Sequence, residues 1–497
     1  MVLEQYLVGS TLEVKFSSQD ETKIKTAKGF FWSFIENFLS QIVTFIVGIV
    51  LSRLLSPDLF GMVGMIVIFI AISEIFVNSG FHQSLIRKQN ANQEDFSTIF
   101  FTNLGIAFVF LIALLGISPS IAQFYGLPIL GEILPVFGIV VFIDALALVQ
   151  KTDLTRKLDF KLLAKISLVS NLVGGSIGII AAYQGLGVWS LVMKSIFQKL
   201  TSTILLWLQN KWRPLLIFNW VLLKEHFRFG NKLLISGIID TIFANLYYLV
   251  IGKYFSMTEV GYYSRADQFQ KMPSSNFSSV VSRVSFPVLA ALTGNDIELR
   301  LTFRKLLQGT MIVSISMMSM LAAFSDTLIE VLIGKAWLPC VIYLKLLCVI
   351  GMFYPLHHLN LLIPQVVNRP EIFLRLEIIK KIILVMVVGL GVQWGVVWML
   401  QATIVFNVLA YFLHAWSTAR LINYSIVSQT KTLIGPLILG CGVYISVALL
   451  RMICDLDTPF LFLLIQVLVS VIAFYCGVRL FFREYYNIFL SLLMKQV

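Results

Sequence analysis

The sequence contains few charged residues. Asp, Glu, Lys and Arg together make up 13% of its 497 residues, whereas about 25% is usual in soluble domains. Hydrophobic residues make up 58%, which leaves too little polar surface to cover a protein of this size in water. The composition excludes a soluble enzyme, a disordered protein and a secreted disulfide scaffold. Because about 20 apolar residues span a bilayer, it predicts a polytopic membrane protein.

Motifs for cofactors and for ATP hydrolysis are missing from the sequence. The five cysteines are scattered and form no C-x-x-C or Cys/His zinc spacing. No GxxxxGK(S/T) loop and no HExxH motif occurs. We therefore expect no cofactor and no metal, and energy for any work by the protein would have to come from an ion gradient or from a substrate gradient. The first 28 residues are polar without an apolar h-region, so we expect no cleavable signal peptide.

Long apolar runs predict an all-α fold with fourteen membrane spans. The spans cover residues 31–51, 60–80, 97–117, 132–150, 166–183, 188–208, 230–250, 260–281, 309–324, 338–360, 378–394, 396–417, 433–450 and 460–482. They predict a cytoplasmic tail (1–28), a six-helix bundle (29–208), a cytoplasmic linker (209–229), a second six-helix bundle (230–417), an extra helix pair (418–482) and a cytoplasmic C-terminal tail (483–497).

The basic residues lie mostly on one side of the predicted membrane. With the N-terminus inside, 28 Lys and Arg residues fall in inside segments, and the outside loops hold only Arg53, Lys253, Lys335 and Arg451. Cytoplasmic loops carry such an excess of positive charge. We therefore predict that both termini are cytoplasmic, and we interpret the net charge of +12 as a topology signal rather than as a nucleic-acid-binding surface.

An internal repeat supports two equivalent halves. A shift of 200 residues aligns VLSRLLS at 50–56 with VIGKYFS at 250–256 and Gly61 with Gly261, without a gap. Because six is an even number, both halves enter the membrane in the same direction. Halves of this kind are related by a pseudo-two-fold axis along the membrane normal, and a site at their interface is typical of transporters.

Ten ionisable residues are clear cases of charged groups deep within the predicted spans. Such residues are costly in hydrocarbon and usually face the bundle interior or a water-filled cavity. The acids are Glu36, Glu74, Asp144, Asp240 and Asp267, and the cations are Lys194, Lys199, Arg265, Lys271 and Lys345. Any of these acids could form a proton or sodium site, or instead a hydrogen bond between packed helices. Lys194, Arg265 and Lys345 lie nearer the span ends, where snorkelling to the interface explains them equally well.

The eighth span carries a polar stripe. Its members recur at three- and four-residue steps, as one face of a helix requires: Ser264, Asp267, Gln268, Lys271, Ser275, Ser278 and Ser282. The stripe predicts a cavity lining, with a plain Asp267–Lys271 ion pair as the alternative. We predict that Lys199, Arg265 and Lys271 face a cleft between the halves and attract an anion, with Lys199 and Arg265 as the uncompensated cations.

Several stretches resemble a known family, the bacterial polysaccharide flippases of the multidrug/oligosaccharidyl-lipid/polysaccharide exporter superfamily, and within it the colanic acid and teichuronic acid exporter branch. The stretches are SRLLSPDLFGMVGM (52–65), NSGFHQSLIRK (78–88), RKLDFK (156–161), GVWSLV (187–192), GYYSRA (261–266) and FPVL (286–289). The resemblance runs from about residue 25 to about residue 480, and the long polar N-terminal tail departs from it.

The resemblance implies a flippase rather than an enzyme. It implies translocation of a polyprenyl-diphosphate-linked oligosaccharide, such as an O-antigen, capsule or exopolysaccharide unit, across the cytoplasmic membrane by alternating access. The expected partners are this substrate, membrane lipid, and the glycosyltransferases and polymerase of the same pathway, with no nucleic acid and a monomeric state. Two alternatives are a multidrug exporter of the same superfamily, for which acids would dominate the cavity, and a membrane-embedded glycan transferase or polymerase.

Overall fold

The computed structural model describes residues 39–78, 80–453 and 458–485, which are mostly helical and contain no strand. The predicted tail over 1–28 and the predicted site residue Glu36 lie outside these residues. Ten described helices are long and apolar enough to cross a membrane, and the bent pair Trp220–Ala244 and Leu246–Tyr254 makes eleven. The other three predicted spans correspond to a shorter apolar helix and to the helices Met257–Ala290 and Pro370–Gly391. The last two are not among the ten because they carry many polar or charged residues.

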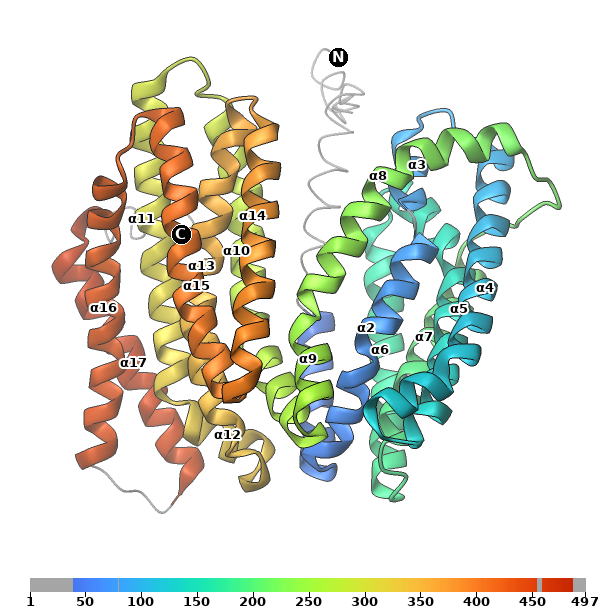
Figure 1. Ribbon diagram of the computed structural model, residues 1–497, viewed down its shortest axis with the longest axis horizontal. Coiled ribbons are helices and arrows are strands. Elements are labelled where there is room, and N and C mark those ends of the chain that lie inside the picture. Colours follow the sequence, from blue (N-terminus) through green and yellow to red (C-terminus); the bar gives the residue numbers. More distant parts are fainter. Residues whose placement is uncertain (1–38, 79, 454–457, 486–497) are drawn as a thin grey trace, which may run out of the picture.

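The first half contains six long helices and one short one. The described part of its first helix is Leu39–Leu54, which carries no label in Figure 1. The others are α2 (Pro57–Asn78), the short α3 (Phe81–Arg87), α4 (Gln93–Tyr125), α5 (Ile129–Arg156), α6 (Phe160–Tyr183) and α7 (Trp189–Gln209).

The second half repeats this order with two broken helices, and a helix pair follows it. Its helices are α8 (Trp220–Ala244) with α9 (Leu246–Tyr254), α10 (Met257–Ala290), α11 (Asp296–Ala323) with α12 (Ser325–Ile333), η1 (Lys335–Trp337), α13 (Cys340–Val366), α14 (Pro370–Gly391), η2 (Val392–Trp394) and α15 (Val396–Ile422). The α8–α9 pair bends by 43°. The last pair is α16 (Ile426–Ile453) and α17 (Pro459–Phe481).

The linker predicted over 209–229 is too long. The side chain of Asn219 accepts hydrogen bonds from the backbone N–H groups of Val221 and Leu222, so it caps α8 and the helix begins at Trp220. Residues 220–229 mix charged, aromatic and aliphatic side chains, and this lowers their hydropathy below that of a span. The apolar run alone therefore placed the start of the helix ten residues too late.

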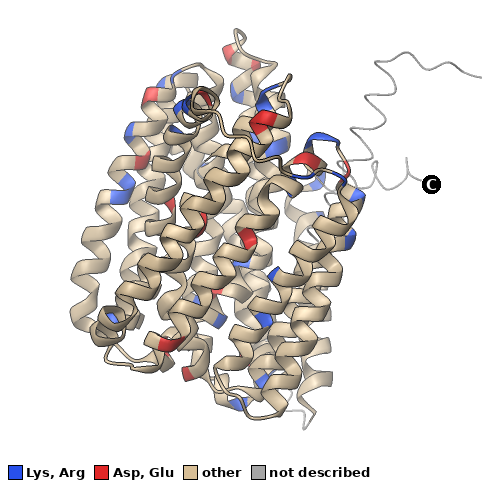
Figure 2. Cartoon of the chain, turned by 90° about the vertical axis from the view of Figure 1, so that its right-hand side faces the viewer, with Lys and Arg blue, Asp and Glu red and all other residues tan. Residues whose placement is uncertain are grey.

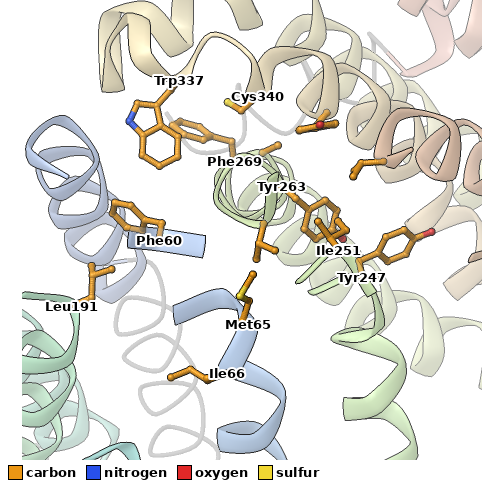
Figure 3. Close-up of a cluster of buried hydrophobic side chains, with 14 of the residues drawn as sticks. Phe60, Met65, Ile66, Leu191, Tyr247, Ile251, Tyr263, Phe269, Trp337 and Cys340 are labelled. Carbon is orange, nitrogen blue, oxygen red and sulfur yellow. The ribbon is translucent and has the colours of Figure 1, made fainter. Parts of the chain in front are cut away.

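The two halves meet at one end of the molecule. Figure 1 shows α2–α7 on one side and α10–α17 on the other, close together where α9 and α12 lie and farther apart at the opposite end. We call the end with α9 and α12 the closed end. The indole N–H of Trp337 donates to the carbonyl oxygen of Ser52 there, at 2.7 Å. Phe60 packs edge-on against Trp337, with ring centroids 5.4 Å apart. Figure 3 labels both side chains.

Helices α2 and α10 cross in direct backbone contact near the closed end. A β-carbon on Gly61 would lie 1.7 Å from the carbonyl oxygen of Met257, and one on Gly261 would lie 1.9 Å from that of Pro57. A shift of 200 residues exchanges these two contacts, so the crossing agrees with the predicted repeat register. Both helices start at the closed end and run toward the other end (Figure 1). Two parallel halves therefore meet through equivalent residues, as in an isologous interface.

Candidate functional site

A cavity of about 370 Å³ lies between the two halves. Residues of both halves line it, from the helix Leu39–Leu54, α2 and α7 on one side and from α9 and α10 on the other. Its charged lining residues are Lys194, Arg265 and Lys271. No carboxylate is among the described residues that line it. We call it the central cavity, and its lining is cationic.

Arg265 enters the central cavity from α10. Its guanidinium lies over the ring of Phe60, 4.1 Å from the ring centroid, which is cation–π geometry. The Nε atom of Arg265 is buried without a hydrogen-bond partner, and no described carboxylate lies within 4 Å of the guanidinium or of the Lys194 ammonium. A buried cation without a counter-ion is costly, so these two residues favour an anionic ligand.

The third cation of the cavity has a partner. The Lys271 ammonium lies 2.8 Å from the Asp267 carboxylate, and the Tyr248 hydroxyl donates to the same carboxylate at 2.9 Å. Asp267 is 4% exposed and faces away from the central cavity, into a cavity of the second half. The ion pair considered from the sequence therefore exists, and it leaves the Lys271 side chain at the boundary of two cavities.

The prediction for Lys199 is wrong. Lys199 was expected to be an uncompensated cation in the cleft, but its ammonium lies 2.9 Å from Asp144 and 3.6 Å from Glu74. These three residues line a separate cavity of about 350 Å³ inside the first half, bounded by α2, α5, α6 and α7. Depth along the helix located Lys199 in the membrane, but depth does not say which face of α7 it occupies.

Asp240 lies in the cavity of the second half, which has a volume of about 670 Å³. It forms an ion pair with Lys381 of α14. Lys381 is one of the 28 basic residues assigned to inside segments, but α14 begins at Pro370, so this lysine lies three turns inside the helix. The buried His357, which lines the same cavity, hydrogen-bonds to His414 at 3.1 Å. Neither Lys381 nor His414 was predicted as a site residue, although they lie within the predicted spans 378–394 and 396–417, because no motif or polar stripe marks them.

Lys345 does not line any of these cavities. Its ammonium lies 2.7 Å from the carboxylate of Asp326 at the start of α12, and Arg451 of α16 contacts the same carboxylate at 2.9 Å. Partial burial alone would raise the pKa of Asp326, but the hydrogen bonds and charges of Lys345 and Arg451 outweigh it and hold this pKa below its ordinary value. Lys345 is therefore a structural partner rather than a cavity cation.

Only the first part of the polar stripe on α10 lines the central cavity. Ser264, Gln268 and Lys271 do so together with Arg265. Ser278, farther along, is buried and donates to the carbonyl oxygen of residue 274 at 2.7 Å. Such a bond satisfies the hydroxyl within its own helix. The stripe is thus partly a cavity lining and partly a buried helix contact.

Two like-oriented six-helix bundles, an additional helix pair and a cationic cavity between the bundles define the fold of a multi-pass membrane transporter. The structure is similar to that of the lipid II flippase MurJ in an inward closed conformation, with a TM-score of 0.74, 14% identity and coverage of 91% of this chain and 99% of MurJ. It is also similar to an inward-facing multidrug resistance MATE family transporter, with a TM-score of 0.61, 13% identity and coverage of 80% of this chain and 99% of that one.

Sequence comparisons identify the family. The family described as "Polysaccharide biosynthesis protein" matches residues 50–342, and the chain belongs to it. Teichuronic acid biosynthesis protein TuaB of Bacillus subtilis is 26% identical over 58% of this chain and 60% of TuaB. Lipopolysaccharide biosynthesis protein WzxC of Escherichia coli is 22% identical over 78% of this chain and 80% of WzxC. The match to TuaB thus spans less than two thirds of that relative.

Proposed function

We propose that this protein is a flippase that carries a polyprenyl-diphosphate-linked oligosaccharide from the cytoplasmic to the outer leaflet. The observation that carries the proposal is the pair of cations Lys194 and Arg265, which come from different halves and share a cavity without a described carboxylate. The family and the names of relatives that act in polysaccharide biosynthesis agree with this substrate class.

The physical problem of such a transporter is the head group. A diphosphate with attached sugars carries charge and many hydroxyl groups, and burying them without partners costs several kcal/mol for each group. Lysine and arginine side chains in the central cavity would bind the diphosphate, with arginine able to contact two oxygens at once. Ser264, Gln268 and Asn245 line the same cavity and offer hydrogen bonds to hydroxyl groups. The prenyl tail would remain in the lipid.

The orientation follows from charge. Loops with the excess of Lys and Arg lie at the end opposite to the closed end, and Figure 2 shows the basic residues concentrated there. Under the positive-inside rule, this end faces the cytoplasm, as do both termini. In this orientation the halves are separated on the side where cytoplasmic glycosyltransferases would deliver the substrate. Rocking of the halves about the closed end would then present the cavity to the outside.

A multidrug exporter is the second candidate. An exporter of cationic compounds requires acids in its cavity, whereas the described lining of the central cavity contains three cations. This difference favours an anionic substrate. A glycan transferase or polymerase would require a catalytic group, and a transfer assay with purified protein tests that candidate directly.

The test is complementation of a strain that lacks glycan export. Replacing Lys194 and Arg265 with Gln removes the two cations of the central cavity that have no described carboxylate partner. Because a hydrogen bond to a charged group contributes about 1.5–3 kcal/mol, export should fall about tenfold or more with unchanged protein abundance in the membrane. The matched control is Lys335→Gln, which removes an exposed cation paired with Glu330. Normal export by the double variant would contradict the proposal.

A further inference from the structure

The first half holds a second charged cluster that the substrate cavity does not use. Glu74 of α2, Asp144 of α5 and Lys199 of α7 approach one another in the cavity of about 350 Å³. The Lys199 ammonium lies 2.9 Å from Asp144 and 3.6 Å from Glu74. We call these three residues the acid–lysine triad. Lys199 lies at the centre of the triad, in contact with both carboxylates. We propose that the triad is a proton-binding site that couples proton entry to export. This inference rests on the proposed function.

The charges of the triad do not balance. One ammonium neutralises one carboxylate, so a second carboxylate remains within the membrane. An isolated charge in that position is costly, and a bound proton removes the cost. The other in-membrane pairs described above are balanced one to one: Asp267 with Lys271, and Asp240 with Lys381.

The described parts of the elements around the triad supply little further charge. Lys151 also lines the cavity, but it lies seven residues from Asp144 along α5, about 10 Å at the helical rise. α6 contributes Ser167, Ser170 and Asn171, which are uncharged. The neighbouring helix Leu39–Leu54 has one charged residue, Arg53, at its far end. α4 carries none over 96–125, and Asp240 of α8, which packs on α2, is bonded to Lys381.

The geometry favours a proton over a sodium ion. The ammonium of Lys199 already occupies the space between the two carboxylates, where it would repel a second cation. In the described part of the chain, no cluster of three His, Cys, Asp or Glu residues could hold a metal ion. Glu74 is the proton acceptor because it is the more distant carboxylate, at 3.6 Å. An O–H bond forms on Glu74 with a proton taken from water in the cavity, and the proton later returns to water on the other side.

Helix α7 connects the triad to the substrate cavity. It directs Lys194 into the central cavity and Lys199 into the triad, five residues or about 7.5 Å farther along. α7 packs closely on α6, since a β-carbon on Gly178 would lie 2.8 Å from the Cβ atom of Lys194. α6 and α7 therefore move as one unit. A change of charge at Glu74 alters the attraction on Lys199 and so shifts α7, which repositions Lys194.

The first test detects the proton itself and requires no substrate. Infrared difference spectra of the full-length protein in detergent, recorded between acid and alkaline pH, report the C=O stretch of protonated carboxyl groups. We expect a titrating band that is lost in Glu74→Gln and kept in the control Glu330→Gln. Lys199→Gln should strengthen the band, because two carboxylates would then lack a cation. A band that persists in Glu74→Gln overturns the proposal.

The second test measures export. In cells at a series of external pH values, wild-type export should increase several-fold as the outside becomes more acidic, and Glu74→Gln should abolish this dependence at equal protein abundance. Asp144→Asn, which leaves Glu74 to pair with Lys199, should abolish it too. Export that follows sodium instead of pH overturns the proton site. If the infrared band is lost in Glu74→Gln but the wild type exports no lipid-linked glycan, the proposed function fails and the proton site stands.

Discussion

Arg53 and Lys253 lie 200 residues apart in the sequence and hold the two halves together in the same way. The Arg53 guanidinium donates to the carbonyl oxygen of Leu332 at 2.7 Å, at the end of α12 in the second half. The Lys253 ammonium donates to the carbonyl oxygen of Phe124 at 2.6 Å, at the end of α4 in the first half. Each cation thus binds the C-terminus of the third helix of the opposite half, where the helix dipole favours positive charge.

These two contacts predict a latch at the closed end. Arg53→Gln combined with Lys253→Gln should shift the protein toward a state open at that end. Both contacts are exposed to solvent, so each contributes at the low end of the range for charged hydrogen bonds. We expect the open population to increase about tenfold. Lys335→Gln is the control, because Lys335 pairs with Glu330 within the second half.

The labelling rate of the Cys340 thiol measures how often the closed end opens. The Cys340 side chain is fully buried in the closed end, in the same hydrophobic cluster as Phe60 and Trp337 (Figure 3). In a background with Ser at 441, 454 and 476, a membrane-impermeant maleimide added outside should label the double variant about tenfold faster than the wild type. The same low labelling rate in both proteins would show that these contacts do not keep the end closed.

The glycine crossing gives a second prediction. Gly61→Ala places a methyl group 1.7 Å from the carbonyl oxygen of Met257, and backbone at that distance has to move. We expect a loss of about 1–3 kcal/mol or more in stability and reduced export, measured by thermal unfolding in detergent and by complementation. Gly261→Ala should behave alike, because it meets Pro57 in the equivalent contact. Gly105→Ala, which meets no atom within 4 Å, is the control and should change neither quantity.

Sequence patterns predicted the spans and the repeat because both depend on local apolar runs and spacing. Each of the fourteen predicted segments overlaps a helix, and Gly61 and Gly261 meet as the register requires. The pairing of Lys199 was not predictable, because its partners Glu74 and Asp144 are 125 and 55 residues away and helix rotation decides whether they meet. Lys194, five residues before Lys199, faces a different cavity for the same reason.

The Asp267–Lys271 pair predicts an asymmetric response to mutation. Asp267 is the more buried partner, with 6% of its side chain exposed against 41% for Lys271. Lys271→Gln leaves a buried carboxylate, whereas Asp267→Asn leaves an ammonium that still reaches water. Thermal unfolding should therefore show a larger loss for Lys271→Gln, about 1–3 kcal/mol. The double variant should recover most of it. Equal losses in the two single variants would contradict this assignment.

The contacts of Asp326 predict a loss of stability in acid. Its folded-state pKa lies below the ordinary value, so its ionised form stabilises the fold. This contribution is fully present above the ordinary pKa of an aspartate and is lost as the pH falls through the lowered folded-state pKa. The melting temperature of the wild type should fall over that acidic range more steeply than that of Asp326→Asn. Parallel curves for the two proteins would exclude Asp326 as the group responsible.

The last prediction concerns the orientation of the molecule in the membrane. The closed end should face the outside of the cell. Reporter fusions after residues 90, 158, 292 and 370 follow the basic loops and should be active as cytoplasmic reporters. A fusion near Gly126, just beyond the C-terminus of α4 at the closed end, should be active as an external reporter. The reason is the excess of Lys and Arg in the loops at the other end. A cytoplasmic signal at Gly126 would place the latch formed by Arg53 and Lys253 inside the cell, and the direction of transport would have to be reversed.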